Sequence, residues 1–260
     1  MIRYWRVFKQ ASKNSFSYLL SYRGDLFFKM FIGLGWSLTW IGFISVFFLH
    51  TSSFQGWEKV DVILLLFTFE FITLGNALAS QIEFLDESVR RGSFDNVIVK
   101  PIDSQFLATF SRPDITNVVF FVFYQIPMLV LLIRYDVAIH WPMLPLYLFL
   151  VACGVAIWIA LKSIVCSLSF LAEKIDTLRY LLFSLVELGK YPVSIFPKPL
   201  RIFFHTFIPI AFITFVPAEV FLGRVDWTLV VITPILTLSL IVLSRFVWKT
   251  TVKRYKSASG

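Results

Sequence analysis

The residue types that most often perform catalysis are present in this chain, but their spacing assembles no known site. The histidines His50, His140 and His205 stand far apart, and no H-E-x-x-H or C-x-x-C pair of metal ligands occurs. Gly189-Lys190 lacks the earlier glycine and the following Ser or Thr of a phosphate-binding loop, and no G-x-S-x-G nucleophile turn with a histidine partner appears. We therefore expect no metal site, no cofactor and no ATP hydrolysis in this chain.

Two acidic residues lie within apolar runs, where a charge is costly. Glu70 sits near the middle of the run 60–79, and an ionised carboxylate at that depth should be protonated, paired or turned to a polar cavity. Glu70 is therefore either a proton or cation site, or the partner of a Ser, Thr or Asn in an interhelical hydrogen bond. Glu187 has Lys190 three residues later, which favours a simple ion pair.

The composition sets these residues in a membrane. Of 260 residues, 58% are hydrophobic, 15% are charged and 30 are Phe, and a soluble globule of this size cannot bury so much apolar surface. Cys153 and Cys166 share one apolar run, about 20 Å apart if it is helical, so they are predicted to be buried free thiols. The net charge of +8 comes from basic residues between the apolar runs, which indicates membrane orientation rather than nucleic-acid binding.

Six apolar runs are long enough to cross a bilayer core of about 30 Å as helices. The predicted spans are 30–49, 60–79, 115–133, 144–166, 178–195 and 227–248. Six crossings place 18 of the 24 Lys and Arg residues, and both termini, on the cytosolic side. We therefore predict an all-α polytopic protein that forms a single transmembrane domain over residues 1–260, with a cytosolic tail at 249–260.

Two further segments depart from simple spans. Residues 203–222 are apolar, but Pro209 and Pro217 interrupt them, and a full crossing there moves the basic C-terminal tail to the outer side. Residues 197–223 are therefore predicted to form a re-entrant hairpin that enters from the outer face. Residues 1–29 contain no signal peptide; their Lys and Arg gather on one helical side, which predicts an amphipathic helix in the cytosolic headgroup layer, either as a plain anchor or with a mechanical role.

Two segments between the spans carry a family pattern. The first lies in the cytosolic loop 80–113 and reads EFLDESVRRGSFDNVIVKP over Glu83–Pro101. The second runs from Tyr191 to Arg224 and combines Tyr191-Pro192, Arg201, Pro209 and Pro217-Ala218. Both resemble the membrane subunits of ABC type-2 exporters, particularly the small bacterial permeases that work with a separate ATPase and usually a partner permease. In that family the loop reads basic–Gly–x–apolar–Asp, then apolar residues and Pro, a pattern matched here by Arg91, Gly92, Phe94, Asp95, Ile98 and Pro101.

The resemblance implies a transport mechanism driven by another protein. The loop 80–113 is then the coupling loop, the segment that docks on an ATPase, with site residues Glu83, Asp86, Glu87, Arg90, Arg91, Gly92, Phe94, Asp95 and Pro101. The outer hairpin then caps the translocation path, with Tyr191, Pro192, Arg201, Pro209, Pro217 and Glu219 as gate residues. The plainer interpretations are a solvated turn and a lid that only fills space.

The implied assembly contains this permease, a second permease (a copy or a relative) and two ATP-binding subunits that hold ATP and Mg²⁺. It belongs in the bacterial cytoplasmic membrane, contains no nucleic acid, and exports an amphipathic or lipid-like substrate. The alternative from the residues alone is a secondary carrier or channel that uses Glu70. A membrane-embedded enzyme acting on lipid lacks the nucleophile–base and metal constellations it needs.

Overall fold

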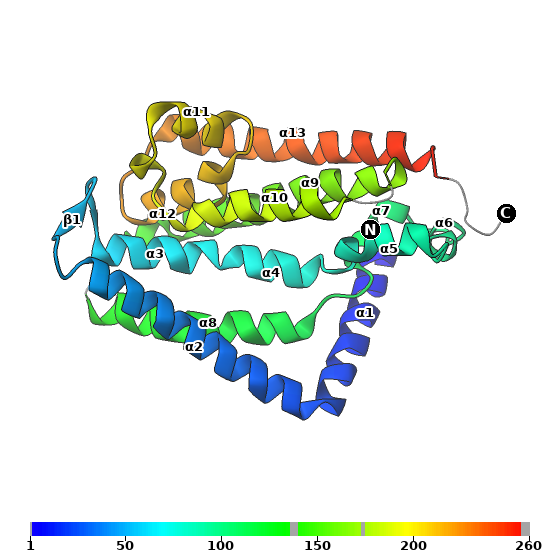
Figure 1. Cartoon of the computed structure of the whole chain (residues 1–260), viewed down its shortest axis with the longest axis horizontal. Helices are drawn as coiled ribbons and strands as arrows, with labels where there is room; N and C mark the ends of the chain where they lie inside the picture. The colour runs from blue at the N-terminus through cyan, green and yellow to red at the C-terminus, as the bar shows by residue number, and fades with distance from the viewer. Residues whose placement is uncertain (1, 136–139, 173–174, 256–260) are drawn as a thin grey trace.

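Long helices running side by side form most of the molecule (Figure 1). The structure is a computed structural model that describes residues 2–135, 140–172 and 175–255, and it is 81% helical. In this part of the chain five helices are long and apolar enough to cross a membrane, and a sixth if one bent pair of helices counts as a single span. The five are Arg23–Phe47 (α2), Lys59–Leu78 (α3 and α4), Ile115–Arg134 (α8), Trp141–Phe170 (η2, α9 and η3) and Trp227–Val252 (α13). The predicted helical architecture, with several helices able to cross a membrane, is therefore confirmed.

The shorter elements connect these helices at their two ends. At one end lie the two-residue strands β1 (Ser53–Phe54) and β2 (Trp57–Glu58), paired antiparallel, and the helices of the predicted hairpin. At the other end lie the helices of the coupling loop and the far end of α13 (Figure 1). Within the loop these are η1 (Gln81–Phe84), α5 (Leu85–Arg90), α6 (Asp95–Ile98) and α7 (Ser104–Phe110).

The N-terminal helix is shorter than predicted. Helix α1 (Ile2–Ser21) runs across the end of the bundle rather than along it (Figure 1). Tyr22 leaves helical geometry with φ −115° and ψ 62°, and α2 begins at Arg23 with Asp25 in its first turn, where a negative charge stabilises a helix. The predicted boundary between residues 29 and 30 is therefore wrong, since residues 23–29 belong to the long helix α2.

The predicted fifth span, 178–195, is not one helix. Helix α10 (Asp176–Val186) is followed by the 3₁₀ turns η4 (Glu187–Lys190) and η5 (Val193–Ile195). Tyr191 between them is extended, with φ −110° and ψ 143°, because the residue before a proline is disfavoured in helical geometry and Pro192 has no N–H to donate. At 11 residues, α10 is about 16 Å long and does not by itself cross a bilayer core of about 30 Å.

The predicted hairpin is a bent pair of helices packed into the core. Helix α11 (Lys198–Thr206) meets the π-helix η6 (Ala211–Phe215) and α12 (Val216–Phe221) at 75°. All five residues of η6 are buried, and η6 packs so closely on α9 that a Cβ added at Gly154 lies 2.6 Å from the Ile213 carbonyl oxygen. Glycine is therefore required where α9 passes the hairpin.

Several predicted features lie wholly or partly on residues outside the described ranges. These are the polar break at Glu173 and Lys174 and the last residues of the predicted tail, 256–260. Met1 and residues 136–139 are also outside the described ranges. The number of crossings and the side of the membrane on which each end lies remain predictions.

Candidate functional site

The coupling loop is a set of short helices with a defined turn at its centre. Helix α5 has Asp86 and Glu87 in its first turn and ends with Arg90, so the charges at both ends interact favourably with the helix dipole. Gly92 follows with φ +70°, a left-handed conformation that glycine adopts without strain and that ends many helices. The backbone N–H of Phe94 then donates to the Ser88 carbonyl oxygen at 3.1 Å. The Arg-Gly-x-Phe pattern therefore produces a fixed turn rather than a loose loop.

Aromatic side chains hold this turn against the bundle. Phe94 is 1% exposed, and its ring centroid lies 4.9 Å from that of Phe170, 6.2 Å from that of Trp248 and 5.3 Å from that of Tyr255. Burial and the neighbouring Asp95 carboxylate raise the pKa of Tyr255. Phe94 of the family pattern thus lies in a small aromatic core that joins the coupling loop to η3 (Leu168–Phe170) and to the end of α13, and Asp95 acts on Tyr255 of that core.

A buried lysine forms the first of three polar anchors between the loop and the long helices. Lys162 of α9 is 3% exposed. Its Nζ lies 2.8 Å from Glu83 Oε1 of the loop and 2.9 Å from Asn76 Oδ1 of α4. It also lies 5.9 Å from the centre of the Trp158 ring. The lysine therefore connects the loop with two membrane helices at one point.

The second anchor is Arg179 of α10. Its guanidinium donates to the Glu83 carbonyl oxygen and to Asp176 Oδ1 at 2.6 Å, and it lies 3.5 Å from Asp86 Oδ1. Asp86 is 5% exposed and has Arg90 at 3.6 Å as a second cationic partner. A buried carboxylate needs such partners, so Asp86 serves to fix α5 in place.

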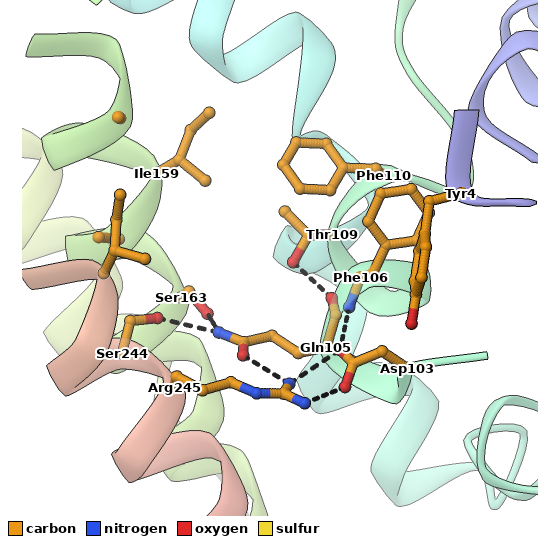
Figure 2. Close-up of a pocket in the computed structure, with 13 residues that line it drawn as sticks. Tyr4, Asp103, Gln105, Phe106, Thr109, Phe110, Ile159, Ser163, Ser244 and Arg245 are labelled. Atoms are coloured by element: carbon orange, nitrogen blue, oxygen red, sulfur yellow. Dashed lines mark hydrogen bonds and ion pairs between the residues drawn. The ribbon is translucent and has the colours of Figure 1, made fainter. Parts of the chain in front are cut away.

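The third anchor joins α7 to the last long helix (Figure 2). Arg245 of α13 forms an ion pair with Asp103 and donates to Gln105 Oε1 at 3.0 Å. Gln105 Nε2 in turn donates to Ser163 Oγ of α9 and Ser244 Oγ of α13, each at 2.9 Å. Burial raises the pKa of Asp103, but hydrogen bonds from Arg245 and from backbone N–H groups outweigh this and hold its pKa below the ordinary value.

The opposite face of the coupling loop is exposed. Arg91 and Glu87 pair with each other at 2.6 Å, with side chains 75% and 41% exposed. Phe84 is 53% exposed and Val99 is 78% exposed, although both are apolar. A surface hollow of about 460 Å³ lies between this face and the start of α8, lined by Ser80, Gln81, Phe84, Glu87, Ser88, Arg91, Ser93, Arg112 and Asp114. The remaining residue of the predicted set, Pro101, is also exposed.

The predicted gate residues do not gather into one site. Arg201 is exposed and donates to the carbonyl oxygens of Ser194 and Phe196 at 3.0 and 3.3 Å, so it fastens α11 to the segment before it. Pro192, Pro209 and Pro217 are buried, Glu219 is half-buried and Tyr191 is 38% exposed. These residues therefore shape the hairpin from several positions.

The two carboxylates singled out in the sequence, Glu70 and Glu187, have close partners. Glu70 is 3% exposed, lies at the break between α3 (Lys59–Phe69) and α4 (Phe71–Leu78), and accepts a hydrogen bond from Thr73 Oγ1 at 2.8 Å. Glu187 forms an ion pair with Lys190, as their spacing predicts. The Lys190 Nζ lies 4.9 Å from the centre of the Phe69 ring.

Sequence reasoning missed four residues that the structure places at key contacts. Lys162 lies within the apolar run 144–166. A charge inside a membrane span is costly and needs a partner, which is the same signal that drew attention to Glu70. Arg179 and Arg245 also lie inside predicted spans, 178–195 and 227–248, within a few residues of an end. At the β1 end, Arg224 Nη2 lies 2.6 Å from Asp61 Oδ2, an ion pair between residues 163 positions apart. Only the three-dimensional structure brings such pairs together.

Comparisons with known proteins identify one family. Residues 34–259 match a family model described as "ABC-2 family transporter protein". No curated protein and no solved structure matches the chain. In the described ranges 2–135, 140–172 and 175–255, no three His, Cys, Asp or Glu side chains lie close enough together to hold a metal ion.

Proposed function

The chain belongs to the ABC-2 family of transporter proteins, and we propose that it is the permease subunit that couples ATP hydrolysis on a separate protein to outward transport. The family match runs from within α2 to the C-terminal tail, so it includes the coupling loop and the hairpin. Members of this family are membrane components of transporters and are generally not catalytic themselves. The resemblance seen in the sequence is therefore confirmed, and the coupling mechanism is our proposal.

The two-sided construction of the coupling loop is the observation that carries this proposal. One face is exposed, with Phe84, Val99 and the Glu87–Arg91 pair available to a partner protein. The other face is tied to α9, α10 and α13 by ion pairs and to the end of the bundle by aromatic contacts. Because packed elements move together, a displacement of the exposed face reaches three helices at once.

The orientation follows from the distribution of charge. We place the coupling-loop end and both termini in the bacterial cytosol, because that arrangement puts 18 of 24 basic residues inside. Helix α1, which crosses the ends of the other helices, then lies along the cytosolic face of the membrane (Figure 1). The bent pair α11 and η6–α12 then enters and leaves on the outer side as a re-entrant hairpin.

The complete transporter contains more than this chain. We propose two ATP-binding subunits, which hold ATP and Mg²⁺, and a second permease that is either a copy or a relative. Helices α2, α8 and α13 leave most of their apolar surface exposed, which lipid or a second permease can cover. The many aromatic and aliphatic residues of the spans and their few charges favour an amphipathic or lipid-like substrate.

Charge reversal on the exposed face tests this function. Glu87→Arg and Arg91→Glu each break the internal pair and invert one surface charge, whereas the double variant restores the pair and inverts both charges. If the face docks on an ATPase, all three variants lower the amount of ATPase that co-purifies, and Lys198→Glu on exposed α11 does not. Full recovery in the double variant contradicts docking, because the two charges then serve only each other.

A carrier that uses Glu70 is the second candidate function. It is favoured by the burial of a carboxylate at a break within a membrane helix. The hydrogen bond from Thr73 supplies the packing explanation for the same residue. The carrier works without an ATPase. Transport by this chain alone that is lost in Glu70→Gln therefore separates the two candidates.

A further inference from the structure

A cavity of about 520 Å³ lies above the third anchor of the coupling loop (Figure 2). Its walls come from α1, α7, α9 and α13, which are far apart in sequence. Ile159 and Phe110 line one part of it, while Gln105, Ser163 and Ser244 line the other (Figure 2). The cavity is therefore amphipathic, with an apolar wall and a polar floor. The volume is within the range of about 300–1,000 Å³ that is usual for small-molecule sites.

The polarity of the cavity is ordered along the helix axes. Ala156 lies near the middle of α9, and Ser163 lies seven residues, or about 10 Å, nearer the coupling loop. On α13 the order is the same, because apolar Ile241 precedes Ser244 and Arg245. Half of a bilayer core is about 15 Å deep, so the cavity extends from near the membrane centre toward the surface on the coupling-loop side.

The floor offers hydrogen-bond donors that the protein does not use. The amide N–H groups of Gln105 donate to Ser163 Oγ and Ser244 Oγ, so each hydroxyl accepts one hydrogen bond. Both serines are 3% exposed, and among the hydrogen bonds of the described residues neither hydroxyl donates one. Each O–H is thus free for an acceptor oxygen of a ligand. Asp103 neutralises the charge of Arg245, so a ligand at the floor need not be an anion.

The cavity can be reached from the surface of the bundle. Ile241 on its rim is 45% exposed and Tyr4 is 37% exposed. Little of α13 is buried within this chain, so its apolar side is open to lipid in the single chain. A molecule already in the bilayer therefore has a lateral route to the floor.

We propose that this cavity binds one phospholipid of the inner leaflet as a resident ligand. Its ester or phosphate oxygens accept hydrogen bonds from Ser163 and Ser244, and an acyl chain follows Ile159 and Ile241 toward the membrane centre. A lipid of that leaflet has this orientation, with its polar end toward the cytosol, and to this extent the inference rests on the proposed orientation. Because Arg245 and Gln105 form both the floor and the third anchor, the lipid stabilises the attachment of the coupling loop to α13.

Photo-crosslinking in lipid nanodiscs tests the site. The full chain is incorporated with a phospholipid that carries a diazirine on its acyl chain, and the labelled peptides are mapped by mass spectrometry. We expect labelling to concentrate on residues 156–163 and 241–245. Ile241→Trp, which fills the rim, should lower this labelling about tenfold. Val242→Trp is the matched control, because Val242 is 68% exposed and does not line the cavity.

Equal labelling in the two tryptophan variants, or labelling spread evenly over all exposed helices, overturns the site. Ala156→Phe repeats the test from α9, and an unchanged unfolding temperature shows that each variant is folded. The measurement needs no ATPase, so it fails independently of the proposed function. Modification of a cysteine placed at exposed Lys249, from one side of sealed vesicles, tests the orientation separately.

Discussion

The two ends of the molecule differ in the balance of their contacts: the β1 end has the Arg224–Asp61 ion pair, but close packing dominates there, whereas three ion pairs tie the coupling loop to the bundle. At the coupling-loop end, Lys162, Arg179 and Arg245 reach across from three helices to carboxylates of the loop. Toward the β1 end, the fully buried π-helix η6 packs on α9 so closely that the backbones of Ile213 and Gly154 are in contact. Long charged side chains keep their partners through small shifts, whereas close-packed backbones tolerate almost none. The first end is suited to receive a displacement and the second to move as a block.

The close-packed end should show the largest effect of a single methyl group. In Gly154→Ala the new Cβ lies 2.6 Å from the Ile213 carbonyl oxygen, so α9 or the hairpin must shift. We expect a loss of about 1–3 kcal/mol in unfolding free energy, measured as a lower unfolding temperature of the purified protein. Gly35→Ala is the control, because no atom lies within 4 Å of its Cβ, and it should be neutral or slightly stabilising. Equal unfolding temperatures for the two variants contradict the contrast.

At the coupling-loop end, loss of an ion pair should impair the coupling between the loop and the hairpin more than it lowers the stability of the protein. Lys162→Met removes the cation that joins Glu83 to Asn76, while Lys162→Arg keeps it. Because the Glu83 side chain is 43% exposed and can be hydrated, the cost in stability is about 1–2 kcal/mol, below that of a fully buried pair.

The readout for Lys162 is the response of the far end to nucleotide. A cysteine at Ile202, which is 55% exposed on α11, reports on the hairpin through its rate of maleimide modification, and the native Cys153 and Cys166 are buried. We expect the ATP-dependent change in that rate to vanish in Lys162→Met, to persist in Lys162→Arg, and the ATPase to co-purify with both. Persistence in Lys162→Met removes this anchor from the coupling path.

The third anchor should respond to acid. The pKa of Asp103 is lowered by its partners, so its contribution to stability is present above the ordinary value of 3.8 and is lost as the pH falls through the lower folded value. Asp103→Asn should lower the unfolding free energy by about 1–2 kcal/mol at neutral pH. The difference in unfolding temperature between wild type and Asp103→Asn should narrow only below pH 3.8. A difference that disappears between pH 7 and pH 5 contradicts this assignment.

The smallest effect is expected at Glu70. In Glu70→Gln the amide oxygen still accepts the hydrogen bond from Thr73, so the unfolding free energy should change by less than about 1 kcal/mol. ATP hydrolysis by the assembled transporter and the nucleotide response of the hairpin should be retained. Transport by the purified chain without an ATPase, abolished in a folded Glu70→Gln variant, contradicts this and favours the carrier alternative.

Much of the architecture was predictable because lipid permits few solutions. Apolar runs of about 20 residues, their charge asymmetry and the prolines of the hairpin indicate the long helices and the bent pair. Helix boundaries were predicted less well where single residues interrupt a helix inside an apolar run. Tyr22 separates α1 from α2 without a strong breaker, and the Tyr191–Pro192 step ends what reads as a continuous span.

The candidate site was predictable only in its local part. The turn at Gly92 and the first-turn acids of α5 follow from residues close together in sequence. The partners of the loop do not, because Lys162 and Arg245 lie 79 and 142 positions from Glu83 and Asp103. Lys162, Arg179 and Arg245 all lie inside predicted spans within a few residues of an end, where basic residues are common, so nothing local indicates their partners.

The central claim is that force enters this protein through the exposed face of the coupling loop. Its most direct test is a photo-crosslinking amino acid placed at Phe84 in cells, with Ile202 of the hairpin as control. The two sites are matched in exposure, at 53% and 55%, but lie at opposite ends of the molecule. We predict that the Phe84 adduct contains a phosphate-binding-loop ATPase and that the Ile202 adduct does not. An ATPase attached at Ile202, or none at Phe84 in a fully assembled membrane protein, contradicts it.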